Sequence, residues 1–192
     1  IELMAKTTDE IIAVNSGSAP NIAFGRLTPD NVTGNSVTQW HGGNNLYFWD
    51  RAYEYILRIN TFLEKMEEIT ITLDNKDLLV AEARFLRGWI YFNMIERFGD
   101  VPLVTETYEL GSDHTFTSTP FDQVVTFIET EFAAIMPTLP KYYSSADSNF
   151  GRPTQAICQA ILSRMHLYAA SPLFNPNNDK AKWEKAYKSS KT

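Results

Sequence analysis

One short segment of the chain gathers two aromatic rings and three hydrogen-bonding side chains around a Gly-Gly pair. Its candidate ligand-binding residues are Trp40, His41, Asn44, Asn45 and Tyr47. An aromatic ring can stack on the apolar C–H face of a sugar, while amide and imidazole groups hydrogen-bond the sugar's hydroxyls. The alternative is structural: the tryptophan fixes the loop to the helix that follows, and the asparagines serve turns. Both interpretations stay open.

A second aromatic pair, Tyr142-Tyr143, lies in a polar segment before Gly151. The two rings could line a ligand site or contact another protein. Packing of the loop onto a neighbouring helix is the simpler interpretation.

Catalytic and metal chemistry find little support in the residue pattern. The run His41-Gly42-Gly43 is typical of an oxyanion loop, but no Gly-x-Ser-x-Gly motif accompanies it. The three histidines have no spacing suited to zinc. Adjacent acids such as Glu67-Glu68 point to different sides of a helix and indicate a solvated surface. We therefore expect no catalytic residue, no metal and no cofactor.

Charge and composition exclude several classes of protein. The chain has 192 residues and a net charge of −6, and it has no basic cluster beside aromatic residues, which argues against nucleic-acid binding. No run of about 18 apolar residues is present, so no membrane span is expected. The first residues lack the features of a signal peptide. Cys158 is the single cysteine and lies in a helical pattern, which predicts a small buried apolar group.

Hydrophobic periodicity predicts an all-α fold. Helices are expected over residues 46–68, 77–98, 119–135, 154–170 and 180–190, with a looser helical pattern over 1–14. Gly99 and Pro102 mark the end of the second helix, and Thr119 followed by Pro120 predicts the cap and first residue of the third. Residues 15–45 are rich in Asn, Gly, Ser, Thr and Pro and predict a long loop. Residues 101–107 are expected to be extended.

The second and fourth helices repeat one pattern. A shift of 77 positions places Ala83, Phe85, Arg87, Ile90 and Tyr91 on Ala160, Leu162, Arg164, Leu167 and Tyr168. This echo predicts tetratricopeptide-like helix hairpins, which need stacked neighbours to cover their apolar faces. The last helix has no such neighbour, so residues 1–192 are expected to form a single partial domain. Arg84, Arg87 and Arg164 are expected to be buried structural residues that pair with Glu82, helix ends or carbonyls.

Several stretches, taken in order over residues 46–187, resemble the N-terminal part of SusD/RagB-type outer-membrane lipoproteins. The stretches are Trp49-Asp50-Arg51-Ala52-Tyr53, Ala81-Glu82-Ala83-Arg84-Phe85-Leu86-Arg87-Gly88-Trp89, Arg97-Phe98-Gly99-Asp100-Val101-Pro102-Leu103, Gly151-Arg152-Pro153-Thr154, Ala160-Ile161-Leu162-Ser163-Arg164 and Ser171-Pro172-Leu173-Phe174-Asn175. The chain departs from the family in two ways. Family members are several hundred residues long, and their lipidated N-terminal cysteine is absent here.

The resemblance implies a protein that is not an enzyme. It implies a lipid-anchored protein on the extracellular face of the outer membrane, which captures oligosaccharides and delivers them to a SusC-type TonB-dependent transporter. Contact with the membrane would be made only through a lipid anchor that this chain does not contain. The alternatives are a peptide-binding member of the same family, a tetratricopeptide scaffold for protein partners, and a helical glycan-processing enzyme.

Overall fold

The computed structural model describes residues 49–70, 74–108 and 115–191. These residues form five helices: α3 (Trp49–Glu68), α4 (Lys76–Phe98), α5 (Phe121–Ile135), α6 (Gln155–Ala170) and α7 (Lys180–Ser189). Backbone contacts divide the chain into two units, residues 1–51 and 52–192. The predicted helix over 1–14 and the long loop over 15–45 lie outside the described residues. The expectation of a single partial domain therefore stays a prediction.

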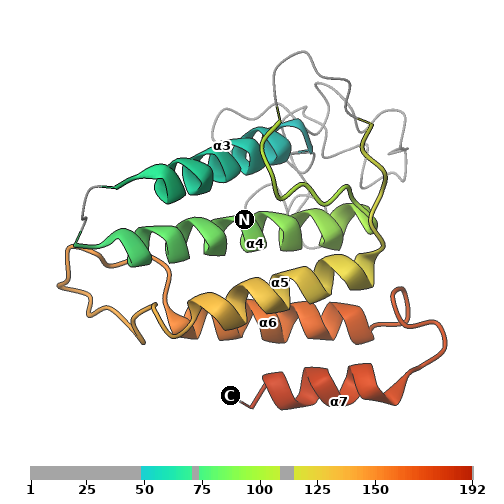
Figure 1. The fold of residues 1–192 in the computed structure, drawn as a ribbon. Coiled ribbons are helices and arrows are strands. Elements are labelled where there is room, and N and C mark those ends of the chain that lie inside the picture. Colours follow the sequence, from blue (N-terminus) through green and yellow to red (C-terminus); the bar gives the residue numbers. More distant parts are fainter. Residues whose placement is uncertain (1–48, 71–73, 109–114, 192) are drawn as a thin grey trace, which may run out of the picture. The chain divides into compact units, whose positions relative to one another are not determined.

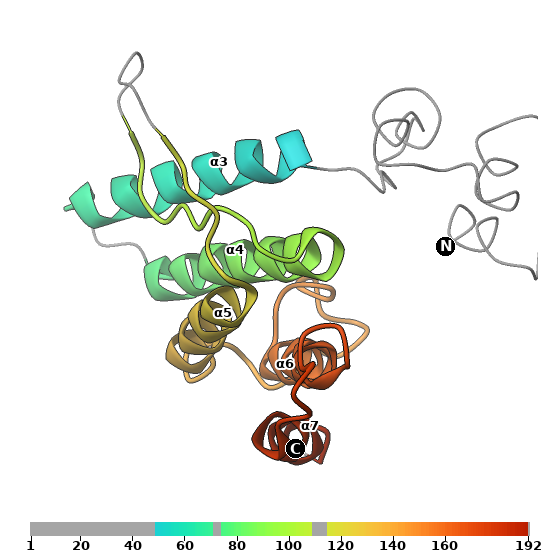
Figure 2. The same ribbon diagram turned by 90° about the vertical axis from the view of Figure 1, so that its right-hand side faces the viewer.

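The helices stack side by side as hairpins, which confirms the all-α, tetratricopeptide-like prediction. Figure 1 shows α3, α4, α5, α6 and α7 stacked in chain order, and Figure 2 shows α6 and α7 nearly end on while α3 is seen lengthwise, so the direction of the helices turns along the stack. Helix α4 packs along α5, and α6 packs along α7. The described part of the chain contains no strand, only an isolated antiparallel bridge between Val101 and Thr119.

The extended segment after α4 passes between α3 and α4 and joins them (Figure 1). The Tyr53 hydroxyl on α3 donates a hydrogen bond to Pro102 O at 2.8 Å. The Tyr91 hydroxyl on α4 accepts one from Val104 N at 2.7 Å. Asn60 donates to the carbonyls of Val104 and Glu106 at 3.2 and 3.1 Å. These bonds satisfy backbone groups that have no sheet partner, so buried polar side chains hold the first hairpin together.

The core of the unit is aromatic and aliphatic where α4 meets α5. Phe85 and Phe132 stack with ring centroids 5.4 Å apart. Gly88 lies directly against Phe132, and a Cβ atom there would come within 2.5 Å of its Cε1 atom. Tyr91 is fully buried, and burial raises its pKa to about 12. A glycine at position 88 therefore sets how closely α4 and α5 approach.

The helix ends mostly follow the prediction. Gly99 ends α4 with a positive φ of 69°, and Thr154 caps α6 by accepting a hydrogen bond from Ile157 N at 3.3 Å. The prediction for α5 is wrong: Thr119 is not its cap, because its backbone pairs with Val101. The cap position is occupied by Pro120, and the first amide donates instead to the Asp100 carboxylate at 2.8 Å.

Cys158 is fully buried, as its helical pattern predicts. Burial raises the pKa of its thiol to about 12. The thiol is therefore protonated and unreactive at neutral pH.

Candidate functional site

The predicted binding residues Trp40, His41, Asn44, Asn45 and Tyr47 lie outside the described residues. Their role in ligand binding stays a prediction. The second aromatic pair is described, and its two rings differ. Tyr142 is 77% exposed, whereas Tyr143 is partly buried. The structure therefore leaves one ring of this pair available to a partner and uses the other in packing.

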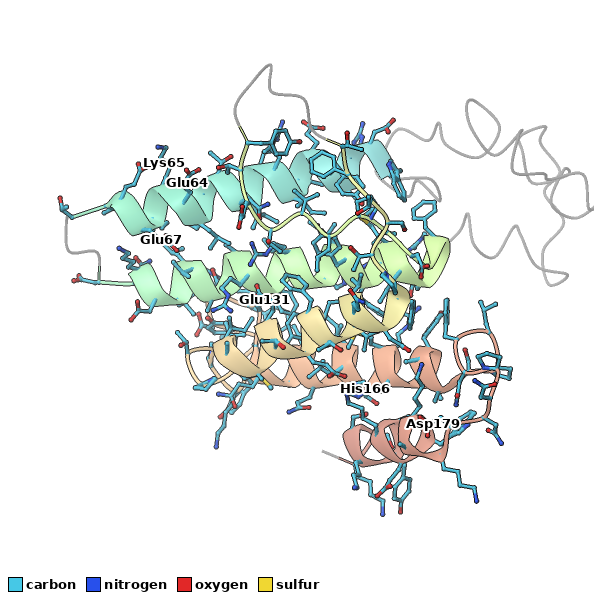
Figure 3. The ribbon with its side chains drawn as sticks, turned by 45° about the vertical axis from the view of Figure 1, so that its right-hand side comes forward. Glu64, Lys65, Glu67, Glu131, His166 and Asp179 are labelled. Carbon is cyan, nitrogen blue, oxygen red and sulfur yellow. The ribbon has the colours of Figure 1, made fainter. Side chains whose placement is uncertain are left out.

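A groove lies between α3, the first half of α4 and the segment around Thr105. Its volume is about 780 Å³, within the range of small-molecule sites. Charged side chains from α3, α4, α5 and the extended segment line it, chiefly Glu64, Glu67, Arg84, Arg87, Glu106 and Glu131. Figure 3 shows Glu64 and Glu67 on α3 and Glu131 on α5, with α4 between these two helices.

Glu131 forms the centre of the groove's floor. Its side chain is only 8% exposed, and its carboxylate accepts hydrogen bonds from Arg84 Nη2 at 2.7 Å and from Arg87 Nη2 at 2.8 Å. Arg84 Nε adds contacts of 3.3 and 3.2 Å to the two carboxylate oxygens. Burial opposes ionisation and is the largest single effect. The hydrogen bonds from Arg84 and Arg87 together outweigh it, so the pKa of Glu131 lies below its ordinary value.

Arg87 connects this floor to the first hairpin. Its Nη1 atom donates to Asn60 Oδ1 at 2.8 Å and to Thr105 O at 3.3 Å. The Phe127 ring lies 5.5 Å from the guanidinium carbon, within the range of a cation–π contact. The residue is 7% exposed, and its Nε atom is buried with no hydrogen-bond partner. The floor of the groove thus has donor capacity that the surrounding side chains do not use.

The arginine predictions are partly wrong. Arg87 is buried and donates to the Thr105 carbonyl, as expected, but its carboxylate partner is Glu131 and not Glu82. Glu82 pairs instead with Arg152, whose Nε donates to Oε1 at 2.8 Å. The side chain of Arg164 is 61% exposed and lies 3.4 Å from Glu96, so it is not buried. Its guanidinium carbon lies 5.8 and 5.7 Å from the ring centroids of Phe92 and Tyr168.

A second polar cluster joins α5, α6 and α7. His166 is buried and its Nε2 atom lies 2.7 Å from Glu129 Oε1, while Lys185 from α7 contacts the same carboxylate. Burial opposes ionisation of Glu129 most strongly. Its hydrogen bonds to His166 and Lys185 outweigh burial and lower its pKa. Within the described ranges, no group of three or more His, Cys, Asp or Glu side chains could hold a metal ion.

The lowered pKa values of Glu129 and Glu131 do not suit a general acid. A general acid needs a carboxyl that retains its proton near neutral pH. Glu131 and Glu129 are both held ionised by cationic or imidazole partners. Neither residue is therefore suited to act as an acid catalyst.

Comparisons with known proteins agree with these features. The model of a family described as SusD-like_3, "Starch-binding associating with outer membrane", matches residues 8–167. The solved structure of a protein named BT4246 is 25% identical, covers 91% of this chain and superposes with a TM-score of 0.72. Surface glycan-binding protein A from Bacteroides uniformis is 30% identical over 75% of this chain, with a TM-score of 0.58. A laminarin-binding SusD-like protein is 25% identical over 74%, with a TM-score of 0.60.

The chain spans only part of these relatives: it covers 31%, 30% and 28% of their respective lengths. The curated proteins give no match. None of the helices that the structure describes is long and apolar enough to cross a membrane.

Sequence reasoning missed the groove because four separate segments of the chain assemble it. One signal was present. Glu131 falls on the apolar stripe of its helix, between Ile128 and Phe132. A charge on the buried side of an amphipathic helix requires a partner of opposite charge, and that requirement could have pointed to the arginines of the preceding helix.

Proposed function

The chain belongs to the SusD-like family, and from that premise we propose that the whole protein binds an oligosaccharide at the surface of the outer membrane and delivers it to a transporter. The family is one of carbohydrate-binding proteins that associate with the outer membrane and are generally non-catalytic. The observation that carries the proposal is the family match over residues 8–167, together with the shared fold of relatives that bind glycans.

The helical unit supports this function as a scaffold. Polar bonds that are buried or partly buried join α3 and α4 to each other and to the extended segment between them, so the surfaces that these helices carry are held in fixed positions. Rigid scaffolds that position loops are common in binding proteins. The loop that contains Trp40 and Tyr47 precedes α3 directly, and we propose that it contributes to the saccharide site by ring stacking.

The proposed mechanism is capture followed by transfer. The saccharide binds by stacking on aromatic rings and by hydrogen bonds to its hydroxyls, and it leaves unchanged. The partner that receives it is proposed to be a SusC-type TonB-dependent transporter, and the protein is proposed to be lipid-anchored on the extracellular face. No step of this mechanism needs a proton donor, which agrees with the ionised state of Glu129 and Glu131.

Isothermal titration of the full-length protein tests the proposal. The titrants are neutral oligosaccharides of different linkage, including laminarin fragments, and short peptides as the competing class. We expect saturable binding of at least one oligosaccharide, weakened by Trp40→Ala or Tyr47→Ala. Binding of peptides alone would contradict the choice of ligand. Absence of a TonB-dependent transporter among proteins that co-purify from outer membranes would contradict the choice of partner.

A further inference from the structure

The groove between α3 and α4 is polar and has no aromatic residue among those that line it. Its apolar contribution comes from Leu63, Met66 and Val80, and the remaining lining side chains are charged or polar. A ligand there cannot stack on a ring, unlike a ligand of the proposed aromatic loop. Recognition would have to use hydrogen bonds to the ligand's edges.

The rim of the groove offers acceptors that the described residues do not use. Within the described part of the chain, the carboxylates of Glu67, Asp77 and Glu106 make no hydrogen bond or ion pair. Glu64 accepts one hydrogen bond, from the Thr107 hydroxyl at 2.7 Å. An ionised carboxylate accepts about four hydrogen bonds, so these four groups can receive several donors from a ligand.

The floor offers donors in place of acceptors. The Arg84 side chain is 29% exposed and uses Nε and Nη2 for Glu131, which leaves Nη1 uncommitted among the described contacts. Behind it, Arg87 Nε is buried without an acceptor. The floor therefore has an uncommitted donor, and the exposed side of the groove has uncommitted acceptors.

The balance of charges in the groove disfavours anionic ligands. Five carboxylates and three cationic side chains line it, so anions are repelled at the rim. No cluster of described residues suits a metal ion, and the polar lining disfavours an apolar ligand. A neutral molecule with many hydroxyl groups avoids the cost of desolvating a charge and supplies both donors and acceptors.

We propose that this groove is a second saccharide-binding site, which recognises the hydroxyl edges of a neutral sugar. Adjacent ring hydroxyls match the spacing of the two oxygens of a carboxylate, so Glu67 can take a pair of hydroxyls. The uncommitted Nη1 of Arg84 can donate to a further sugar oxygen. The volume of about 780 Å³ accommodates more than one sugar ring. The assignment rests on the proposed function and adds a site to it whose lining residues differ from those of the aromatic loop.

Neighbouring glutamates on α3 provide a matched test. Glu67 lines the groove, whereas the exposed Glu68 pairs with Lys65 at 2.8 Å and does not line it. In the full-length protein, Glu67→Ala combined with Glu106→Ala should weaken one class of saccharide sites about tenfold, the loss expected for one or two hydrogen bonds to charged groups. Glu68→Ala should bind as the wild type does. Far-UV circular dichroism confirms that each variant is folded.

The outcomes separate the two proposals. Titration with the oligosaccharide that binds the wild type should show two classes of site, one sensitive to Glu67→Ala and the other to Trp40→Ala. Unchanged binding in the Glu67 and Glu106 variant would overturn the groove site and leave the proposed function standing. Binding of glycylglycine, but of no saccharide, in a Glu67-dependent manner would overturn the choice of ligand. Failure of every saccharide to bind would overturn the proposed function itself.

Discussion

Replacing Glu131 by leucine should strongly destabilise the helical unit. The carboxylate is the shared partner of Arg84 and Arg87, at 2.7 and 2.8 Å. Without this carboxylate, the Arg84 guanidinium can be hydrated by solvent, because its side chain is 29% exposed. The Arg87 guanidinium cannot be hydrated in this way, because its side chain is only 9% exposed. Its remaining hydrogen-bond acceptors are Asn60 Oδ1 and the Thr105 carbonyl. An uncompensated buried charge costs about 3–5 kcal/mol, which is a large part of the stability of a typical domain.

The loss should depend on pH in a direction set by Glu131. Because its folded pKa is lowered, its contribution is fully present above the pKa of an unfolded glutamate, about 4.3. It is lost as the pH falls through the folded value. Wild type and Glu131→Leu should therefore differ most near pH 7 and converge in acid. Urea denaturation followed by far-UV circular dichroism at several pH values measures this difference.

Two controls test the reasoning. Glu54→Ala removes an exposed ion pair with Arg58 on α3, and it should leave the free energy of unfolding nearly unchanged. Adding Arg87→Met to Glu131→Leu should recover most of the loss, because the buried charge is then gone. A loss below about 1 kcal/mol for Glu131→Leu alone, or no recovery in the double variant, would refute the role assigned to this cluster.

Three further predictions concern packing, capping and reactivity. Gly88→Ala should lower the free energy of unfolding by about 1–3 kcal/mol, because its Cβ would lie 2.5 Å from Phe132; a thermal melt equal to that of the wild type would contradict this packing. Asp100→Ala should lower the free energy of unfolding by about 1 kcal/mol, because it removes the acceptor for Phe121 N. Asp100→Asn retains a side-chain oxygen acceptor, so its free energy of unfolding in a urea titration should stay close to that of the wild type. Cys158, whose pKa burial raises to about 12, should resist iodoacetamide at pH 8 until urea is added, and mass spectrometry showing rapid labelling of the native protein would count against its burial.

Helix positions were predictable because local signals fix them. Gly99 and Pro102 end α4, Thr154 caps α6, and Ser171 with Pro172 ends it. The tetratricopeptide-like pairing also followed from a local pattern, since the repeated apolar faces of α4 and α6 each require a neighbour. These features depend on residues within a few positions of one another.

The ion pairs and the α5 cap were not predictable in the same way. Arg84 and Glu131 are 47 positions apart, and Arg152 and Glu82 are 70 apart. The position of each arginine in the sequence indicates that it requires a partner of opposite charge. Which carboxylate becomes that partner depends on how α4, α5 and the loop before α6 pack. Likewise, Asp100 caps α5 across 21 positions, because the Val101–Thr119 bridge brings the two segments together.

The candidate binding residues also fall into those that the sequence indicates and those that only the folded structure shows. The aromatic loop was found by composition alone, and its residues, Trp40 among them, stay a prediction. The groove needed the structure, because Glu67, Arg84 and Glu106 come from three elements that meet only in the folded chain. Composition indicates which side chains could bind a sugar, whereas packing decides which of them converge.

The most direct test of the central claim is to titrate the full-length protein with an oligosaccharide and then analyse the ligand that is recovered. The account predicts saturable heat in calorimetry and an oligosaccharide of unchanged length by chromatography after prolonged incubation. Shorter products would show that the protein is an enzyme. The absence of saturable binding across neutral oligosaccharides would contradict the claim that it captures glycans.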